Sequence, residues 1–305
     1  MGLVLKILKI VGIVLLVLIV SIAVLLLCLF MRPFVPNDYT KTVETGGELE
    51  AKYLAMGAHG VKYAEAEAPG DWKKFEVFYP AGLESGADAY PVVVFANGTG
   101  VAASKYKALF KHLASWGFIA LGNEDPSTCT GDSAEAALAW LLEQNGDPDS
   151  VFYQKVDRSH IGISGHSQGG VAVFNAVGEQ PHGGLYTCAV SLSPTEWALA
   201  MAIGLDYDPG KMTAPTLILA APEKDVIAPE GVKSLAGAIP AGTVTALRSG
   251  MDHGKMLYSA DGYVTAWFMW HLQGDQDAAK AFAGDDAELL ANPLYQDQQI
   301  ALKGT

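Results

Sequence analysis

The segment that most constrains the fold runs from Ser159 to Glu179 and reads SHIGISGHSQGGVAVFNAVGE. Residues 160–164 form a short run with β-branched side chains, which is typical of a buried strand. Residues 171–177 are apolar and contain alanine, which favours a helix packed on a sheet. Ser167 stands between these two runs, in a turn bounded by glycines. A strand, a tight turn that carries serine, and a helix together form a nucleophile elbow.

The chemistry of such an elbow explains its residue types. The turn holds the Ser167 main chain in a strained conformation, which lifts the hydroxyl out of the sheet. Gly165 and Gly169 have no side chains, so the strand and the helix can approach closely. The first turn of the helix offers free N–H groups to the same place. A glycine-x-serine-x-glycine sequence alone is a weak signal, so the rest of the chain has to support it.

The rest of the chain alternates strand-like and helix-like segments. Residues 73–79 alternate and are aromatic, which predicts an antiparallel strand near a sheet edge. Residues 91–96 are continuously apolar, as expected of a strand buried on both faces. Further strands are expected at 118–122, 188–192, 215–221 and 244–247, and helices at 104–116, 133–144, 230–238 and 262–272. This order predicts an α/β fold with a mostly parallel central sheet and helices on both faces.

A serine hydroxyl is a weak nucleophile, so it needs an adjacent base, and the base needs an oriented carboxylate. In this architecture the partners follow the serine in the order acid, then histidine, each after a strand. Asp225 follows the strand expected at 215–221, and His253 follows the next strand. Glu223 is the rival acid, although it comes earlier in the loop. We expect His166, which is closer in sequence, to point away from the nucleophile across the turn.

The oxyanion that forms during acyl transfer needs fixed hydrogen-bond donors. We expect one donor to be the main-chain N–H of Gln168, at the start of the helix. The loop after the 91–96 strand would supply the other, from Thr99, because Gly98 and Gly100 let that loop come close. No cluster of histidine, cysteine and aspartate has the spacing of metal ligands, and no cofactor is implied.

Over about residues 50–275 the chain resembles the α/β-hydrolase superfamily, and most closely the cutinase-like polyester hydrolases and dienelactone-hydrolase-like serine esterases. The matching segments are the 165–170 turn, the 214–219 strand that leads to Asp225 and residues 227–229, and residues 251–253. The resemblance implies Ser167 as nucleophile, His253 as base and Asp225 as orienting acid. It also implies Thr99 and Gln168 as the oxyanion hole, and Trp197 as a substrate contact.

Two residues depart from these relatives. The cutinase-like polyester hydrolases usually have methionine where this chain has Gln168, and the dienelactone hydrolases use cysteine where it has Ser167. The chain is therefore expected to be a serine hydrolase that cleaves small or medium carboxylic esters through an acyl-enzyme on Ser167. A lipase or a peptidase with the same triad is the alternative, followed by a non-catalytic binding protein on the same scaffold.

The N-terminal segment is a separate unit. Residues 10–31 are apolar and carry no charge, and about 20 such residues can cross a bilayer. The apolar core of a cleavable signal peptide is shorter, about 7–15 residues, and ends at a small-x-small site that is absent here. We therefore expect a single-pass anchor over residues 1–32, with secretion after signal cleavage as the alternative. Lys6 and Lys9 precede the span, which predicts a cytoplasmic N-terminus and an extracytoplasmic domain.

The remaining boundaries follow from composition. Residues 33–47 have little apolar pattern and indicate a linker, residues 48–275 form the catalytic domain, and residues 276–305 form a polar tail with short helical pieces packed on it. The net charge of −13 disfavours nucleic acid as a partner. Cys129 and Cys188 are permitted to form a disulfide outside the cytoplasm, and two buried free thiols are equally consistent with the sequence.

Overall fold

The computed structural model describes residues 2–303, and the chain divides into two compact units, 1–34 and 35–305. The first unit is the helix α1 (Gly2–Met31). Its segment Lys6–Leu25 has a mean hydropathy of 3.1, and among the described residues this is the one helix that is long and apolar enough to cross a membrane. A signal sequence near the N-terminus passes the same test of length and hydropathy, so α1 is compatible with an anchor and with a signal peptide.

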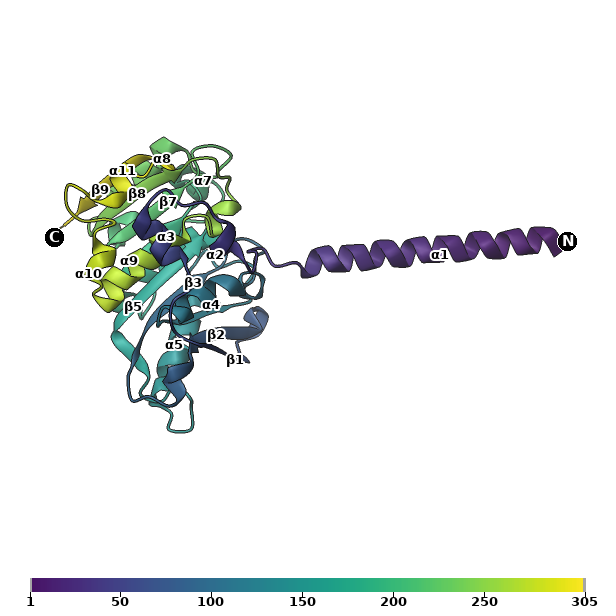
Figure 1. Cartoon of the computed structure of the whole chain (residues 1–305), viewed down its shortest axis with the longest axis horizontal. Helices are drawn as coiled ribbons and strands as arrows, with labels where there is room; N and C mark the ends of the chain where they lie inside the picture. The colour runs from purple at the N-terminus through teal and green to yellow at the C-terminus, as the bar shows by residue number, and fades with distance from the viewer. Residues whose placement is uncertain (1, 304–305) are drawn as a thin grey trace. The chain divides into compact units, whose positions relative to one another are not determined.

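The second unit is built around a nine-stranded sheet (Figure 1). The six central strands are parallel, as expected. They are, in spatial order, β4 (Ile119–Asn123), β3 (Tyr90–Ala96), β5 (Val156–His166), β6 (Tyr186–Leu192), β7 (Thr216–Ala220) and β8 (Gly242–Arg248). The strands β2 (Lys74–Pro80) and β1 (Val61–Glu67) continue the sheet antiparallel at one edge, and β9 (Tyr295–Leu302) does so at the other.

Helices cover both faces of this sheet, which explains why strands such as β3 bury apolar side chains on both sides. One face carries α3 (Glu48–Leu54), α4 (Lys107–Ser115) and α9 (Asp261–Gln273). The other face carries α5 (Asp132–Gly146), α6 (Gln168–Gly178) and α8 (Pro229–Ala238). Within β3, Val93 and Phe95 belong to the first core, and Val92 and Val94 belong to the second. Successive side chains of a strand point to opposite faces, so a strand covered on both sides has no solvent-facing position.

Short elements complete the described chain. The remaining α-helices are α2 (Tyr39–Thr42), α7 (Trp197–Ala202), α10 (Gln276–Ala279) and α11 (Glu288–Ala291). Single 3₁₀ turns lie at Gly70–Trp72, Ala81–Glu84, Ala103–Lys105, Gly183–Leu185, Pro209–Lys211 and Lys255–Leu257. The helix α7 lies in the connection between β6 and β7. Cys129 and Cys188 are both buried free thiols.

Residues 35–47 belong to the second unit and contribute to its core, whereas the composition of 33–47 indicated a linker. Val35 and Tyr39 are buried in the core beside α4 and α9. The Tyr39 hydroxyl donates a hydrogen bond of 2.5 Å to Asp261, whose carboxylate also pairs with the buried His112 at 2.6 Å. Two anchoring side chains are too few to produce a periodic pattern, so the sequence gives no sign of this packing.

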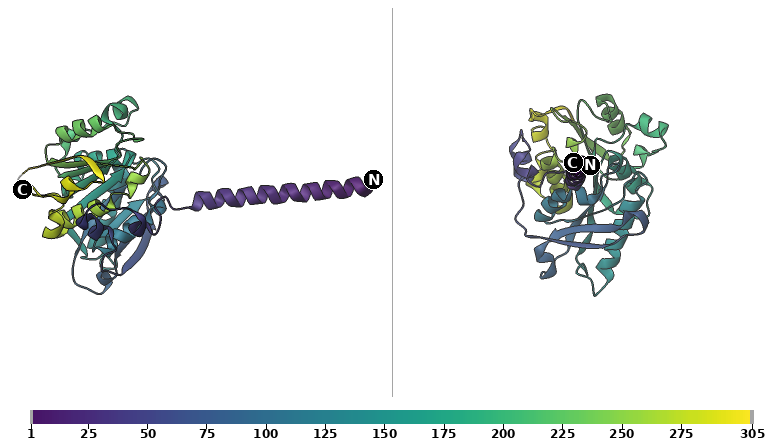
Figure 2. Two further views of the ribbon diagram at one scale, coloured as in Figure 1. Left: turned by 45° about the horizontal axis from the view of Figure 1, so that its top comes forward. Right: turned by 90° about the vertical axis from the view of Figure 1, so that its right-hand side faces the viewer.

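The C-terminal segment contains a strand of the central sheet in addition to the short helices that the sequence predicts. The strand β9 pairs with β8 and extends the sheet, as the yellow arrow beside β8 shows (Figure 2). Tyr295 and Asn292 donate hydrogen bonds to the buried carboxylate of Glu50 in α3. The tail therefore joins the sheet edge to the residues that precede β1. Most side chains of β9 are exposed or half-buried, which hides the strand from a search for apolar runs.

Candidate active site

Ser167 occupies the turn between β5 and α6 and has φ 61° and ψ −122°, a conformation that non-glycine residues rarely adopt. Neighbouring glycines make the turn possible. A Cβ atom on Gly165 would lie 2.1 Å from the carbonyl oxygen of Gly169, and one on Gly169 would lie 2.1 Å from that of Ala96. The strand–turn–helix therefore has the close packing and the strained serine that an elbow requires.

The structure brings Ser167, His253 and Asp225 together from three separate loops. The Nε2 atom of His253 lies 2.9 Å from the Ser167 hydroxyl, and its Nδ1 atom lies 2.7 Å from a carboxylate oxygen of Asp225. Ser167 follows β5, Asp225 follows β7 and His253 follows β8. These parallel strands have their carboxyl ends at one edge of the sheet. Both distances are within hydrogen-bond range, so a proton can pass between serine and imidazole.

Asp225 is held in one orientation by its surroundings. One carboxylate oxygen accepts hydrogen bonds from His253 and from the N–H of Val226, and the other accepts from the Ser193 hydroxyl and the N–H of Ala221. Its side chain is 1% exposed. Burial opposes ionisation, but the four hydrogen bonds outweigh it and hold the pKa of Asp225 below its ordinary value. The carboxylate is therefore ionised beside His253 at neutral pH.

Ser193 is a residue of this site that the sequence analysis did not select. It follows β6, and its hydroxyl lies 2.6 Å from Asp225. Its position immediately after a strand that neighbours β7 was the available signal. The rival acid, Glu223, is exposed and lines a different pocket, described below.

His166 contacts His253 rather than the Ser167 hydroxyl. Its Nε2 atom lies 2.7 Å from the carbonyl oxygen of His253, and the centroids of the two imidazole rings are 4.6 Å apart. Burial, aided by the neighbouring His253, lowers the pKa of His166 to about 4. A neutral imidazole therefore lies against the residue that contacts Ser167.

The expected oxyanion donors lie on two segments around Ser167. A Cβ atom on Gly98 would be 3.5 Å from the Cβ of Ser167, so the loop after β3 packs on the elbow. The adjacent Thr99 is exposed, and Gly100 has φ +69°. Gln168 is the first residue of α6, where a main-chain N–H has no partner within the helix. The Gln168 side chain is buried, and its Oε1 atom has no hydrogen-bond partner in the part of the chain that is described.

Trp197 begins α7 and is 37% exposed. Its ring lies 6.4 Å from that of Tyr207, and both residues line an open, mostly apolar groove of about 530 Å³. Neither Ser167 nor His253 lines this groove. The N–H of Glu196 donates to the carbonyl of Val226, so the residue before Trp197 is tied to the residue after Asp225.

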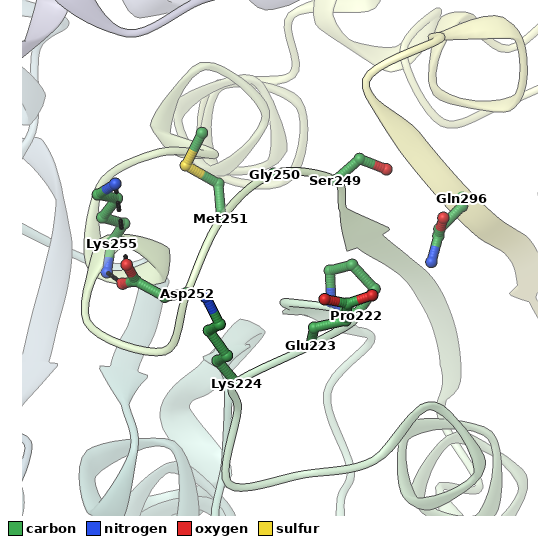
Figure 3. Close-up of a pocket in the computed structure, with 9 residues that line it drawn as sticks. All are labelled: Pro222, Glu223, Lys224, Ser249, Gly250, Met251, Asp252, Lys255 and Gln296. Atoms are coloured by element: carbon green, nitrogen blue, oxygen red, sulfur yellow. Dashed lines mark hydrogen bonds and ion pairs between the residues drawn. The ribbon is translucent and has the colours of Figure 1, made fainter.

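A polar pocket of about 430 Å³ adjoins the loops that carry Asp225 and His253. Figure 3 shows that its walls come from the loop after β7, the loop after β8, and β9. Its charged residues are two acids and two bases: Glu223, Asp252, Lys224 and Lys255. Among residues 2–303, apart from side chains left undescribed in α1, no group of three histidine, cysteine or acidic residues is placed to hold a metal ion.

The fold and this geometry define an α/β-hydrolase, because a mixed sheet with helices on both faces presents a serine elbow at its carboxyl edge. A protein-family model described as PET hydrolase-like matches residues 41–239, which is more than half of the chain. The chain therefore belongs to the PET hydrolase-like family, an α/β-hydrolase family of cutinase-like polyester hydrolases. A search of curated proteins found no match. Membership of this family makes the protein a hydrolase that acts on esters.

Proposed function

We propose that the protein is a serine esterase that cleaves carboxylic esters through an acyl-enzyme on Ser167. The observation that carries this proposal is the continuous hydrogen-bonded line from the Ser167 hydroxyl through His253 to Asp225, with distances of 2.9 Å and 2.7 Å. Family membership supports the same class of substrate.

In this mechanism, His253 takes the proton of Ser167 at Nε2 while the serine oxygen attacks the ester carbonyl carbon. Asp225 accepts the Nδ1 proton in a hydrogen bond, so that Nε2 keeps its lone pair, and its charge stabilises the imidazolium. The imidazolium then protonates the leaving alkoxide, which departs as an alcohol. His253 next removes a proton from water, and the hydroxide formed attacks the acyl-enzyme, releasing the carboxylic acid and regenerating Ser167.

The tetrahedral oxyanion is stabilised by the main-chain N–H groups of Thr99 and Gln168. Each such donor typically contributes about 2.7–4 kcal/mol to the transition state. Gly98 and Gly100 allow the loop after β3 to reach the substrate. Trp197 contacts the substrate from α7, which predicts that Trp197→Ala raises KM and leaves kcat within about twofold. A large drop in kcat with unchanged KM would contradict that role.

The helix α1 anchors the enzyme in a membrane. Residues 1–32 form the anchor, and the hydrolase domain, residues 48–275, lies on the extracytoplasmic side, because Lys6 and Lys9 favour a cytoplasmic N-terminus. The hydrolase unit begins at Val35, and β9 extends its sheet. Mass spectrometry of the mature protein tests this arrangement. An intact N-terminus in the membrane fraction supports the anchor, and a soluble product that begins after α1 contradicts it.

The full chain in detergent micelles should hydrolyse nitrophenyl esters, with activity that falls as the acyl chain lengthens. Ser167→Ala removes the nucleophile and should reduce turnover to background without changing the unfolding temperature. Wild-type turnover in that variant would refute the role of Ser167. Hydrolysis of peptides but not esters would favour a peptidase, and failure of a serine-reactive phosphonate to label Ser167 would favour a binding protein.

The family match supports aromatic polyester as a more specific substrate. A soluble terephthalate diester, compared with an aliphatic diester of similar length, tests this preference on the same enzyme. A kcat/KM at least tenfold higher for the terephthalate would support it, and the reverse order would contradict it.

A further inference from the structure

His166 is bound to the main chain of the histidine that contacts Ser167. A carbonyl oxygen can only accept a hydrogen bond, so the Nε2 atom of His166, 2.7 Å from the His253 oxygen, carries a proton and donates it. The two rings also face one another, with an interplanar angle of 35°. No hydrogen bond joins His166 to the Ser167 hydroxyl among the described residues, so His166 is not itself placed as the base.

His253 needs such support because it lies in a loop. The segment between β8 and the 3₁₀ turn Lys255–Leu257 has no regular secondary structure. The His253 N–H donates to the carbonyl of Lys224 at 3.1 Å, and its own carbonyl accepts from His166. These two bonds hold the main chain of His253 on both sides of its Cα atom, while its side chain extends to Ser167 and Asp225.

We propose that His166 is a positioning residue, which holds the main chain and the ring of His253 so that Nε2 stays within reach of Ser167. This inference rests on the proposed esterase mechanism, in which His253 is the base. A misplacement of about 1 Å at a reacting group can cost roughly 100-fold in rate, so a bond that fixes the loop has a large effect.

The charge state of His166 suits this position. The titratable groups that face it are His253 and Asp225, from the loops after β8 and β7. In the loop after β3, a Cβ atom on Gly98 would lie 3.5 Å from the Nδ1 atom of His166, and the uncharged Tyr106 lines the same small cavity. Burial keeps the pKa of His166 at about 4, so the ring is neutral near pH 7. A neutral donor holds His253 without opposing the positive charge that His253 acquires when it takes the serine proton.

Two variants separate the hydrogen bond from the ring contact. His166→Phe keeps an aromatic ring and loses the N–H donor, whereas His166→Asn loses the ring and keeps a donor. His160→Phe is the matched control, because His160 is a half-exposed histidine on the same strand, paired with Asp157. The assay measures kcat and KM of the full chain on a short nitrophenyl ester, together with thermal unfolding.

We expect kcat of His166→Phe to fall at least tenfold with KM within about threefold, because substrate binding is untouched and the base is displaced. His166→Asn should recover part of that loss, and the control should match the wild type. Wild-type kcat in a folded His166→Phe would overturn the proposal, and equal losses in the Phe and Asn variants would overturn the role of the hydrogen bond. An inactive wild type would instead refute the esterase assignment.

NMR of the ¹⁵N-histidine-labelled wild type tests the same contact without any variant. His166 should show a protonated Nε2 and an unprotonated Nδ1, unchanged between about pH 8 and pH 5.5. The opposite tautomer, or a titration midpoint near 6.5, would overturn the proposal even if the esterase is active.

Discussion

Replacing Asp225 by asparagine removes one negative charge while keeping the shape of the side chain. The carboxylate and the imidazole approach to 2.7 Å, so their charge centres are roughly 4 Å apart when His253 is protonated. At an effective dielectric constant of about 20, this attraction is about 4 kcal/mol. In the proposed mechanism the imidazolium forms as Ser167 attacks the ester, so the loss falls on the transition state and corresponds to about a thousandfold in kcat.

In the Asp225→Asn variant, the existing hydrogen bonds favour an orientation in which the NH₂ group faces Ser193. The Ser193 hydroxyl can rotate to accept a hydrogen bond from this group, whereas the N–H of Ala221 loses its acceptor. The amide oxygen then still accepts from His253, so the tautomer of the base is preserved. One lost main-chain bond predicts a decrease in the free energy of unfolding of about 1–3 kcal/mol, which leaves the protein folded.

The assay is steady-state hydrolysis of a short nitrophenyl ester by the full chain, with urea unfolding of the same preparations. A kcat within tenfold of the wild type in a folded Asp225→Asn variant would refute the electrostatic role of Asp225. Ser193→Ala is the matched comparison, because it removes a hydrogen bond to the same carboxylate and keeps the charge. It should lower kcat far less than the loss of the charge does.

Three further perturbations test other parts of the structure. The pKa values of His166 and His271 are about 4 in the folded protein, below the ordinary value of about 6.5. Between pH 4 and pH 6.5 the unfolded chain therefore binds more protons than the folded one. The free energy of unfolding consequently decreases as pH falls from 6.5 toward 4. His166→Phe should therefore reduce the slope of unfolding free energy against pH near pH 5 by about 1.4 kcal/mol per pH unit, and an unchanged slope in urea titrations would contradict this. Gly165→Ala places a Cβ 2.1 Å from a main-chain oxygen and should prevent native folding, whereas a wild-type unfolding temperature would show that the elbow tolerates a side chain. Tyr39→Phe removes a bond to the Asp261 carboxylate and should cost about 1.5–3 kcal/mol, measured as a fall in Tm of roughly 3–10 °C, and an unchanged Tm would show that residues 35–42 do not stabilise the domain.

The central sheet could be predicted because its signals are local. A parallel strand covered on both faces is a nearly continuous apolar run, and the segments 91–96 and 215–221 have that composition. Ser167 could be selected from its own neighbours, because an elbow needs glycines within two residues. Asp225 and His253 could be selected from topology, since the ends of parallel strands meet at one edge of the sheet.

Other parts of the structure have no comparable signal. The sequence does not indicate that Val35 and Tyr39 are buried, because two apolar side chains in a polar segment do not produce a helical or strand-like hydrophobic pattern. The strand β9 has mostly exposed or half-buried side chains, so it lacks the apolar run that identified the central strands. Only pairing with β8 makes it part of the sheet.

The sequence by itself determined the order of the central strands and the helices between them, the elbow at Ser167, and the loops that carry Asp225 and His253. The tertiary structure alone decided which polar atoms meet around them. His166 and His253 are 87 positions apart, and Ser193 and Asp225 are 32 apart, in loops whose paths depend on the packing of both sheet faces. A hydrogen bond requires atoms to meet within about 3 Å, and no composition or spacing encodes a separation of that size between distant loops.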